Sequence, residues 1–337
     1  MPLDFKDNAS LKPYNTMAVP AITKHLVIIK SISDLYEALK FAAENNLETL
    51  ILGEGSNTLF VNDYSGLVIL NRIKGIEVIE ENKDSVEVKV ASGENWHDFV
   101  SYALRKRWYG LENLGLIPGL VGAAPIQNIG AYGVELKDHL ISVQYLDLKT
   151  MQMTELDCDE CEFAYRNSIF KNALFHTAVI CSITLGLSKK ELVNLSYPAL
   201  ANYFSSNANP NPQQVFEAVC EIRSNKLPNP SEIPNTGSFF KNPIVSKDKH
   251  SELKNEYPDL PSYVIGNNHK LAAAWMIETL GWKNKSIANV CVHKTQALVI
   301  TNPHASSGQN VLELAYAIQS EVNEKFAVNL EIEPQLI

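Results

Sequence analysis

The chain has 337 residues, of which 45% are apolar and 20% charged, and its formal net charge is -9. An acidic chain is a poor candidate for binding nucleic acid or an anionic membrane over its surface, so we expect small-molecule chemistry and neither of those partners. The length favours two or three domains, and we expect a monomer.

The start of the chain, MPLDFKDNAS, has no basic head followed by an apolar stretch, so no signal peptide is expected. No apolar run is long enough to cross a bilayer. The five cysteines are scattered, and Cys158 and Cys161 form a lone CxxC without a second pair or a nearby histidine at ligand spacing. We interpret the cysteines as reduced thiols rather than as a zinc or redox site, and we expect a cytoplasmic protein without a metal.

The first elements alternate between strand and helix. Residues 26–30 read as a short buried strand, Ser33 or Asp34 is expected to cap a helix, and residues 48–52 form a second strand. This pattern predicts a small α/β lobe.

The middle of the chain is richer in strands. Strands are predicted at 67–70, 85–91, 140–148 and 178–187, and a helix near 95–107. We expect an α+β domain with a mainly antiparallel sheet.

Prolines at 209–212 and 228–234 flank a helical stretch and mark the next boundary. An α/β region is expected after them. Its predicted elements are a helix at 269–281, a strand around 296–301, a helix at 308–326 and a last strand at 328–333.

A glycine cluster, Gly53-Glu54-Gly55-Ser56-Asn57-Thr58, follows the second strand. Backbone N–H groups at glycines can approach a phosphate closely. A Rossmann site is not indicated, because the third glycine is missing and no helical pattern follows. A tight turn at the end of a strand explains the cluster equally well.

The segment 113–134 has no charged residue, although five glycines and two prolines interrupt it. It is too interrupted for a membrane helix and too apolar for a solvent loop. Because a buried loop must satisfy its backbone polar groups, a ligand with a diphosphate would provide acceptors for them. A packed structural loop is the alternative.

A third segment, GSFFKNP at 237–243, places a hydroxyl beside two aromatic residues, with a cation and an amide close behind. Taken alone, it is best interpreted as a Gly-Ser turn with two core phenylalanines.

Several strings in order make the pattern specific. They are LKPYNTMAV (11–19), LGEGSNTLF (52–60), IPGLVGAAPIQNIGAYG (117–133), YRNSIFK (165–171), GSFFKNP (237–243), AAWMIETLGW (273–282), QALV (296–299) and LEIE (330–333). Over nearly the whole chain they resemble the UDP-N-acetylenolpyruvoylglucosamine reductase family, in its longer-looped (type I) subclass.

The resemblance implies an α+β, three-domain flavoprotein of the vanillyl-alcohol-oxidase/PCMH-type superfamily, with non-covalent FAD and with NADPH as reductant. It implies FAD-binding subdomains at 1–70 and 71–225, a separate α/β substrate-binding domain at 226–327, and a C-terminal strand at 328–337 that returns to the active site. The residues that it assigns to FAD are Gly53, Glu54, Gly55, Ser56, Asn57, Pro118, Gly119, Gly122, Ala123, Gln127, Asn128, Gly130, Ala131 and Tyr132.

The implied reaction reduces an enolpyruvyl UDP-sugar to UDP-N-acetylmuramate, with hydride passing from flavin N5 to the enolpyruvyl methylene carbon. By resemblance, Ser238 is the proton donor to the adjacent carbon, and Arg166 and Glu333 are the pair that polarises the substrate carboxylate. An enol ether is electron-rich and therefore accepts hydride poorly. The conjugated carboxylate helps only if the negative charge that develops on it is stabilised, which a bidentate cation and a hydrogen-bond donor can do.

Four further residues are assigned to the substrate by the resemblance. Tyr197 corresponds to the tyrosine of a mobile loop, at about 188–212, that closes over the substrate. Lys226 and Asn242 correspond to ligands of the UDP diphosphate and sugar, and Gln296 joins this set.

The C-terminus departs from the family pattern. The family continues LEPEVR, whereas this chain reads LEIEPQLI. Glu333 is the better match to the catalytic glutamate, and Glu331 is the competitor. Two other functions stay open at this point, namely a flavin oxidase or dehydrogenase of the same fold that acts on alcohols or hydroxy acids, and a non-catalytic protein that binds FAD or a UDP-sugar.

Overall fold

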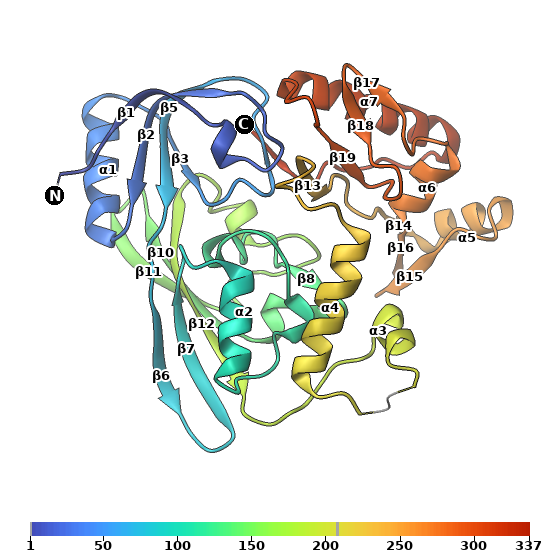
Figure 1. Ribbon diagram of the computed structural model, residues 1–337, viewed down its shortest axis with the longest axis horizontal. Coiled ribbons are helices and arrows are strands. Elements are labelled where there is room, and N and C mark those ends of the chain that lie inside the picture. Colours follow the sequence, from blue (N-terminus) through green and yellow to red (C-terminus); the bar gives the residue numbers. More distant parts are fainter. Residues whose placement is uncertain (1, 207–208) are drawn as a thin grey trace. The chain divides into compact units, whose positions relative to one another are not determined.

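The computed structural model describes residues 2–206 and 209–337. The chain divides into two compact units, each built from separate stretches of sequence, and Figure 1 labels their elements. Unit 1 comprises Met1–Asp7, Lys24–Glu54 and Ser65–Asn225, and unit 2 comprises Asn8–Thr23, Gly55–Tyr64 and Lys226–Ile337. Among the described residues, no helix is both long and apolar enough to cross a membrane.

A four-stranded sheet and one helix form the predicted N-terminal lobe (Figure 1). The sheet has the order β1-β2-β5-β3, and its strands are Lys6–Ser10 (β1), Ile22–Ile29 (β2), Tyr64–Asn71 (β5) and Thr49–Leu52 (β3). β3 pairs with β5 in parallel, and the apolar face of helix α1 (Ile32–Glu44) packs on the sheet. The predicted strand–helix–strand order is confirmed.

The cap of α1 was predicted wrongly. Ser31 is the N-cap, and its Oγ accepts a hydrogen bond from the backbone N–H of Asp34 at 3.1 Å. Ser31 has the extended backbone that an N-cap needs, and its hydroxyl satisfies a backbone donor of the first turn.

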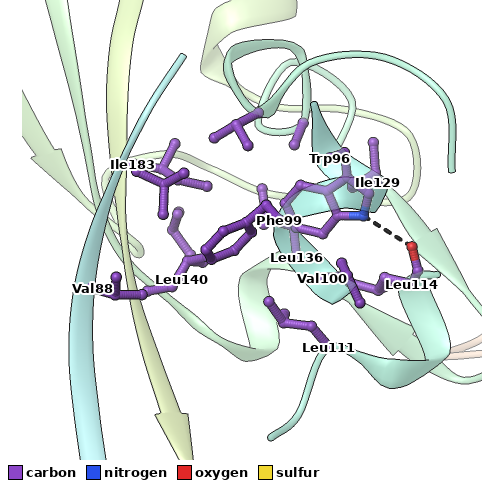
Figure 2. Close-up of a cluster of buried hydrophobic side chains, with 14 of the residues drawn as sticks. Val88, Trp96, Phe99, Val100, Leu111, Leu114, Ile129, Leu136, Leu140 and Ile183 are labelled. Atoms are coloured by element: carbon purple, nitrogen blue, oxygen red, sulfur yellow. Dashed lines mark hydrogen bonds between the residues drawn. The ribbon is translucent and has the colours of Figure 1, made fainter. Parts of the chain in front are cut away.

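An antiparallel sheet of five strands forms the centre of unit 1, as predicted. Its order is β11-β10-β12-β7-β6, and its strands are Gln152–Asp157 (β11), Leu140–Asp147 (β10), Ala178–Ser188 (β12), Ser85–Ala91 (β7) and Ile76–Glu81 (β6). Helix α2 (Trp96–Arg105) packs on this sheet, with Phe99 in the core and the Trp96 Nε1–H donating to the Leu114 carbonyl at 2.9 Å (Figure 2).

The uncharged segment 113–134, with the glutamate on either side of it, forms short elements on the same core. They are the 3₁₀ turns Glu112–Leu114 (η2) and Val121–Ala123 (η3) and the strands Gly130–Ala131 (β8) and Val134–Glu135 (β9). The remaining 3₁₀ turns of the described chain are Lys12–Tyr14 (η1), Leu136–Asp138 (η4) and Ile169–Lys171 (η5).

Two helices complete unit 1, namely α3 (Pro198–Tyr203) and α4 (Pro212–Lys226). Lys226, the last residue of α4, already belongs to unit 2. Within the predicted loop 188–212, residues 207 and 208 lie outside the described residues.

Unit 2 contains three small sheets and three helices (Figure 1). One sheet, β13-β19-β18-β17, is built from Asn235–Ser238, Val299–Thr301, Val290–Val292 and Ser286–Ile287, and helix α7 (Gly308–Phe326) contacts it. A second sheet, β14-β16-β15, is built from Ile244–Ser246, Asn268–Leu271 and Ser262–Ile265. The third is β20 (Gln335–Leu336) in parallel with β4 (Thr58–Leu59), and the other helices are α5 (Lys247–Glu256) and α6 (Ala273–Thr279).

The predictions of two elements in this region were wrong. The helix expected at 269–281 begins only at Ala273, because Asn268–Leu271 pairs with strands on both sides. The strand expected at 328–333 reduces to a single bridge at Ile332, because the Leu330 carbonyl accepts from the Gln319 side chain at 2.6 Å instead of from a neighbouring strand.

Candidate functional site

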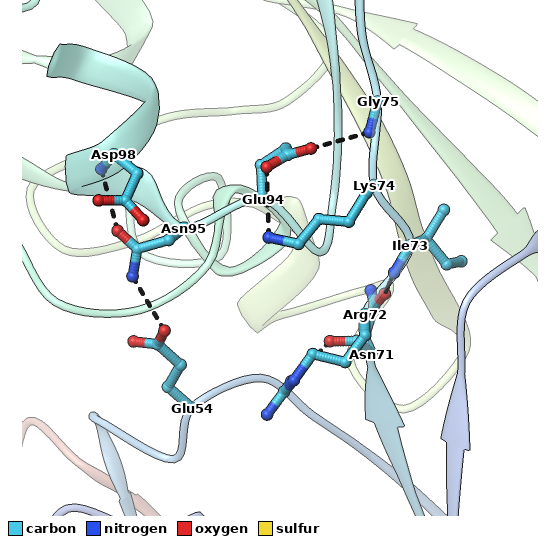
Figure 3. A network of polar contacts seen from close by, with 9 residues as sticks. All are labelled: Glu54, Asn71, Arg72, Ile73, Lys74, Gly75, Glu94, Asn95 and Asp98. Atoms are coloured by element: carbon cyan, nitrogen blue, oxygen red, sulfur yellow. Dashed lines mark hydrogen bonds and ion pairs between the residues drawn. The ribbon is translucent and has the colours of Figure 1, made fainter. Parts of the chain in front are cut away.

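One carboxylate ties the turn after β3 to the loop 118–132. Glu54 accepts hydrogen bonds from Asn95 Nδ2 at 2.9 Å and from the backbone N–H of Gly119 at 3.0 Å. Figure 3 shows Glu54 facing Asn95, whose Oδ1 accepts from the Asp98 backbone N–H as the N-cap of α2. Within unit 1, the carboxylate therefore holds Gly119 against the turn.

Backbone donors gather along the glycine cluster. From Gly53 to Ser56, none of the backbone N–H groups has a hydrogen-bond acceptor among the residues that the structure describes. Two of the carbonyl groups accept hydrogen bonds from the protein instead. Gly53 O accepts from Arg72 Nη1 at 3.0 Å in unit 1, and Gly55 O accepts from the Thr16 N–H at 3.2 Å in unit 2. Successive N–H groups of this kind form a concavity that binds anions.

Gly55 cannot carry a side chain. Its φ is 61°, and a Cβ would lie 2.2 Å from the Tyr14 carbonyl oxygen. The residue is buried, and a buried backbone N–H without a partner costs free energy unless a ligand or water accepts from it. The cluster therefore fits the diphosphate of FAD, and its glycines serve both the turn and the donors.

The loop 118–132 is held mainly by the protein itself. A Cβ on Gly122 would lie 2.5 Å from the Ser92 Cβ. Asn128 is fully buried, and its Oδ1 accepts from the Lys137 backbone N–H at 3.1 Å. Contacts within the protein therefore account for the residue types at positions 122 and 128 without a ligand. Gly119 is also buried, and the remaining loop residues assigned to FAD are exposed or half-buried, namely Pro118, Ala123, Gln127, Gly130, Ala131 and Tyr132.

Arg166 lies at the end of this loop in unit 1. Its Nη2 donates to the Gly130 carbonyl at 3.0 Å, and its guanidinium lies 5.5 Å from the centre of the Tyr165 ring. Its φ is 53°, a left-handed backbone that is uncommon outside glycine and that recurs at functional sites.

A second cation, Arg223 on α4, was missed from the sequence. It is half-buried, its Nε donates to the Leu116 carbonyl at 3.3 Å, and no carboxylate of the described chain pairs with it. Burial, with a smaller effect of the Arg166 charge, lowers the pKa of Arg223, while Tyr132 acts in the opposite direction. Such a cation fits an anionic ligand. Its spacing, three residues before Lys226 on one helix, was the available signal.

Tyr197 directly precedes α3 and lies against the Tyr132 ring, with ring centroids 5.2 Å apart and planes at 75°. Asn113, also missed from the sequence, holds the two segments together. Its buried amide donates to the Tyr132 carbonyl at 2.7 Å and to the Asn194 carbonyl at 2.9 Å. The segment that leads to Tyr197 is therefore docked on the end of the uncharged loop.

In unit 2, the structure brings Ser238 and Glu333 onto neighbouring segments. The backbone N–H of Glu333 donates to the Phe239 carbonyl at 2.9 Å, and the Lys241 N–H donates to the Glu331 carbonyl at 2.9 Å. These backbone bonds set the position of Glu333 relative to the strand that ends at Ser238.

The two competing glutamates differ in environment. The Glu331 side chain is 69% exposed and forms an ion pair with Lys241, whereas Glu333 is half-buried. The ion pair engages the Glu331 carboxylate with the ammonium group of Lys241, whose side chain is only 13% exposed. The environment favours Glu333 as the functional glutamate.

The predicted substrate ligands of unit 2 lie on three different segments, one of them a helix and two of them loops. Lys226 is the exposed last residue of α4. Asn242 Oδ1 accepts from the Ala273 N–H at 3.0 Å, at the start of α6. Gln296 is half-buried, and its carbonyl accepts from the Val299 N–H at 3.0 Å in the turn before β19.

Both units thus contain residues of the predicted site. Unit 1 holds Arg166, Tyr197 and the loop 118–132, and unit 2 holds Ser238 and Glu333. The boundary between the units runs through the glycine cluster itself.

Comparison with known proteins identifies the family. A family model described as FAD binding domain matches residues 23–154, and one described as UDP-N-acetylenolpyruvoylglucosamine reductase, C-terminal domain, matches residues 229–337. A UDP-N-acetylenolpyruvoylglucosamine reductase of Pasteurella multocida is 42% identical over 329 residues, covering 97% of this chain and 96% of that protein. Its counterpart in Escherichia coli O6:H1 is 43% identical and covers 98% and 96%.

A solved structure agrees in fold. The crystal structure of UDP-N-acetylenolpyruvylglucosamine reductase from Thermus caldophilus matches with a TM-score of 0.69 at 20% identity, covering 100% of this chain and 99% of that one. The sequence matches extend over nearly the whole length of both proteins, as the ordered strings predicted. The chain therefore belongs to the UDP-N-acetylenolpyruvoylglucosamine reductase family, and it is an FAD-dependent oxidoreductase.

Proposed function

We propose that the chain reduces UDP-N-acetyl-3-O-(1-carboxyvinyl)-glucosamine to UDP-N-acetylmuramate, for the synthesis of peptidoglycan precursors. The observation that carries the proposal is the match to reductases over 97% of the chain, with both the FAD-binding and the C-terminal domain present. When bound, FAD would take up hydride from NADPH and pass it on to the substrate. The protein's own residues bind, orient and protonate the substrate.

Three side chains act on the substrate in this proposal. Arg166 binds the carboxylate bidentately, and Glu333, in its protonated form, donates a hydrogen bond to the same group, so that the developing negative charge is stabilised. Ser238 gives a proton to the carbon that bears the ether oxygen. The backbone bond from Glu333 to Phe239, next to Ser238, supports a common site for two of them.

The glycine cluster holds the FAD diphosphate in this proposal. The N–H groups from Gly53 to Ser56 are its donors, Asn57 and the exposed or half-buried residues of the loop 118–132 line the remainder, and Glu54 holds turn and loop together. Arg223 adds a positive charge for an anionic part of the flavin or the substrate.

The sugar nucleotide is bound by the remaining predicted residues. Lys226 and Asn242 contact the diphosphate and sugar, Gln296 assists them, and Tyr197 closes over the substrate. The exposed ammonium of Lys226 and the contact of Tyr197 with Tyr132 support these roles.

Domain division, oligomeric state and location complete the proposal. The first sheet ends at Asn71 and the next begins at Ile76, which supports a boundary between 1–70 and 71–225. A substrate-binding domain at 226–327, followed by a returning segment at 328–337, is supported by the Glu333–Phe239 bond. A monomer in the cytoplasm is part of the same proposal, and the five free cysteines support a reducing compartment.

Anaerobic half-reactions test the function. The purified protein should be yellow and should release FAD on denaturation, and NADPH should bleach it. The enolpyruvyl UDP-sugar should then restore the colour. Ser238→Ala should still be bleached at the wild-type rate but should be reoxidised roughly 10²- to 10⁴-fold more slowly, the usual contribution of a general acid.

Control variants make each outcome specific. Ser286→Ala, on the exposed strand β17 of the same unit, should behave as wild type in both half-reactions. Glu333→Gln should slow reoxidation while Glu331→Gln should not. A colourless protein without affinity for FAD would refute the proposal, and reoxidation by an alcohol oxidation product instead of the UDP-sugar would favour an oxidase.

A further inference from the structure

The strand that carries Ser238 is irregular. In the pairing of β13 with β19, Asn235 lies opposite Thr301 and Ser238 lies opposite Val299, so β13 has one residue more than its partner between these pairs. The extra residue forms a bulge, a feature that re-aims a side chain and is common next to active sites. Gly237, within the bulge, has a φ of 73°.

Thr236, the other residue of the bulge, is buried, but packing does not fix Gly237. A Cβ placed on Gly237 would meet no atom within 4 Å. Its backbone N–H is instead bound by one side chain, because it donates to Asn235 Oδ1 at 2.8 Å. The conformation of Gly237, immediately before Ser238, is therefore held by this hydrogen bond rather than by packing around Gly237.

Asn235 is itself firmly fixed. It is 1% exposed, and its Nδ2 donates to the Ile233 carbonyl at 2.7 Å and to the Pro228 carbonyl at 3.1 Å. Its backbone N–H donates to the Thr16 carbonyl at 2.9 Å. One amide thus joins the segment that begins just after Lys226 to the bulge that ends at Ser238.

We propose that Asn235 is a positioning residue for Ser238: its amide holds the bulge, and with it the hydroxyl, in the orientation needed for proton transfer. The inference rests on the proposed role of Ser238 as proton donor. Asn235 touches neither substrate nor flavin in this proposal and acts only through the backbone of Gly237. The same amide restrains the segment that follows Lys226.

The chain provides a matched control in Asn302. This asparagine is also in unit 2 and 0% exposed, and its side chain also makes three backbone hydrogen bonds. Nδ2 donates to the Met17 and Ser306 carbonyls, and Oδ1 accepts from the Ser306 N–H. Loss of Asn302 therefore costs comparable hydrogen bonding without releasing the bulge.

The test measures both half-reactions in FAD-loaded wild type, Asn235→Ala, Asn302→Ala and Ser238→Ala. Asn235→Ala should be bleached by NADPH at the wild-type rate, but the UDP-sugar should reoxidise it roughly 10²-fold more slowly, toward the loss expected for a missing general acid. Its solvent deuterium isotope effect on reoxidation should rise, because proton transfer becomes rate-limiting. Asn302→Ala should lose similar stability in urea and should keep wild-type reoxidation and isotope effect.

A second variant covers the case in which Asn235→Ala does not fold. Gly237→Ala keeps every hydrogen bond and meets no clash, but it disfavours the left-handed backbone. It should slow reoxidation, with a raised isotope effect, and leave bleaching unchanged. If Asn235→Ala and Gly237→Ala reoxidise like wild type while Ser238→Ala is slow, the positioning role is wrong. If Ser238→Ala itself reoxidises like wild type, the proposed function of Ser238 fails instead.

Discussion

Removing the Glu54 carboxylate should weaken FAD binding without unfolding the protein. This side chain accepts from Asn95 Nδ2 and from the Gly119 N–H, and so joins the turn of the glycine cluster to the loop 118–132 (Figure 3). In Glu54→Ala both donors lose their acceptor, and the loop is no longer held against the turn. A ligand that needs both segments must then order them as it binds.

The magnitude follows from the two hydrogen bonds. Each hydrogen bond to a charged group contributes about 1.5 to 3 kcal/mol. Glu54 is half-buried, so water replaces part of this, and about 1.5 to 3 kcal/mol is expected for the pair together. Since 1.4 kcal/mol is tenfold in affinity, the FAD dissociation constant should rise roughly 10- to 100-fold.

The FAD affinity of the conservative variant Glu54→Gln should lie between that of wild type and that of Glu54→Ala. In Glu54→Gln, one amide oxygen can accept from the Gly119 N–H, but the new NH₂ group then faces Asn95 Nδ2. Asn95 cannot simply turn its amide over, because its Oδ1 caps α2 by accepting from the Asp98 N–H. Glu54→Gln should therefore lose about half of the binding free energy that Glu54→Ala loses.

The assay is titration of the apoprotein with FAD, followed by quenching of flavin fluorescence. Glu94→Gln is the control. Glu94 accepts from the Gly75 N–H at 2.9 Å and pairs with Lys74 in the same network (Figure 3), but its carboxylate does not contact the loop. Equal FAD affinity in Glu54→Ala and wild type, or an equal loss in Glu94→Gln, would refute the reasoning.

Three further outcomes are expected. Gly55→Ala should give a protein that does not retain FAD on gel filtration, because the new Cβ would lie 2.2 Å from the Tyr14 carbonyl oxygen at a φ of 61°. Phe99→Ala should lower the free energy of unfolding in urea by about 3 to 5 kcal/mol, as for other fully buried phenylalanines. Burial and the stacked ring of His269, 3.7 Å away, lower the pKa of His250. Because the unfolded chain then binds the proton more readily, this contribution to stability is full above the ordinary histidine value of 6.5 and is lost as the pH falls below it. His250→Asn should reduce the difference between urea midpoints measured at about pH 5 and about pH 8.

Periodicity in the sequence was sufficient for the larger elements. The strict alternation at 85–91 and the helical spacing at 308–326 match the observed β7 and α7 residue for residue. The errors arose where tertiary pairing decided the outcome. Strand β16 took the first residues of an expected helix, and a side-chain hydrogen bond replaced a strand ladder at Leu330.

In the candidate site, too, some residues could be assigned from the sequence and others only from their tertiary contacts. Residues in ordered strings, such as Ser238 and Glu333, could be assigned by resemblance, and those assignments stay predictions. Asn113 and Asn235 lie outside any such assignment, since a buried amide is recognised only by its three-dimensional partners, and for Arg223 the only signal was its spacing from Lys226 on one helix. Sequence spacing does not reveal which carbonyl an amide will meet.

The way unit 2 is assembled has a consequence during translation. Its stretches at 8–23 and 55–64 leave the ribosome long before the C-terminal third exists, yet β4 has its parallel partner at Gln335–Leu336. Gly308, at the start of α7, packs so closely on Phe60 that a Cβ would lie 1.9 Å from its carbonyl oxygen. Strand β4 must therefore stay without its partner strand until residues 335–336 have been synthesised, a delay during which chaperones can engage the nascent polypeptide.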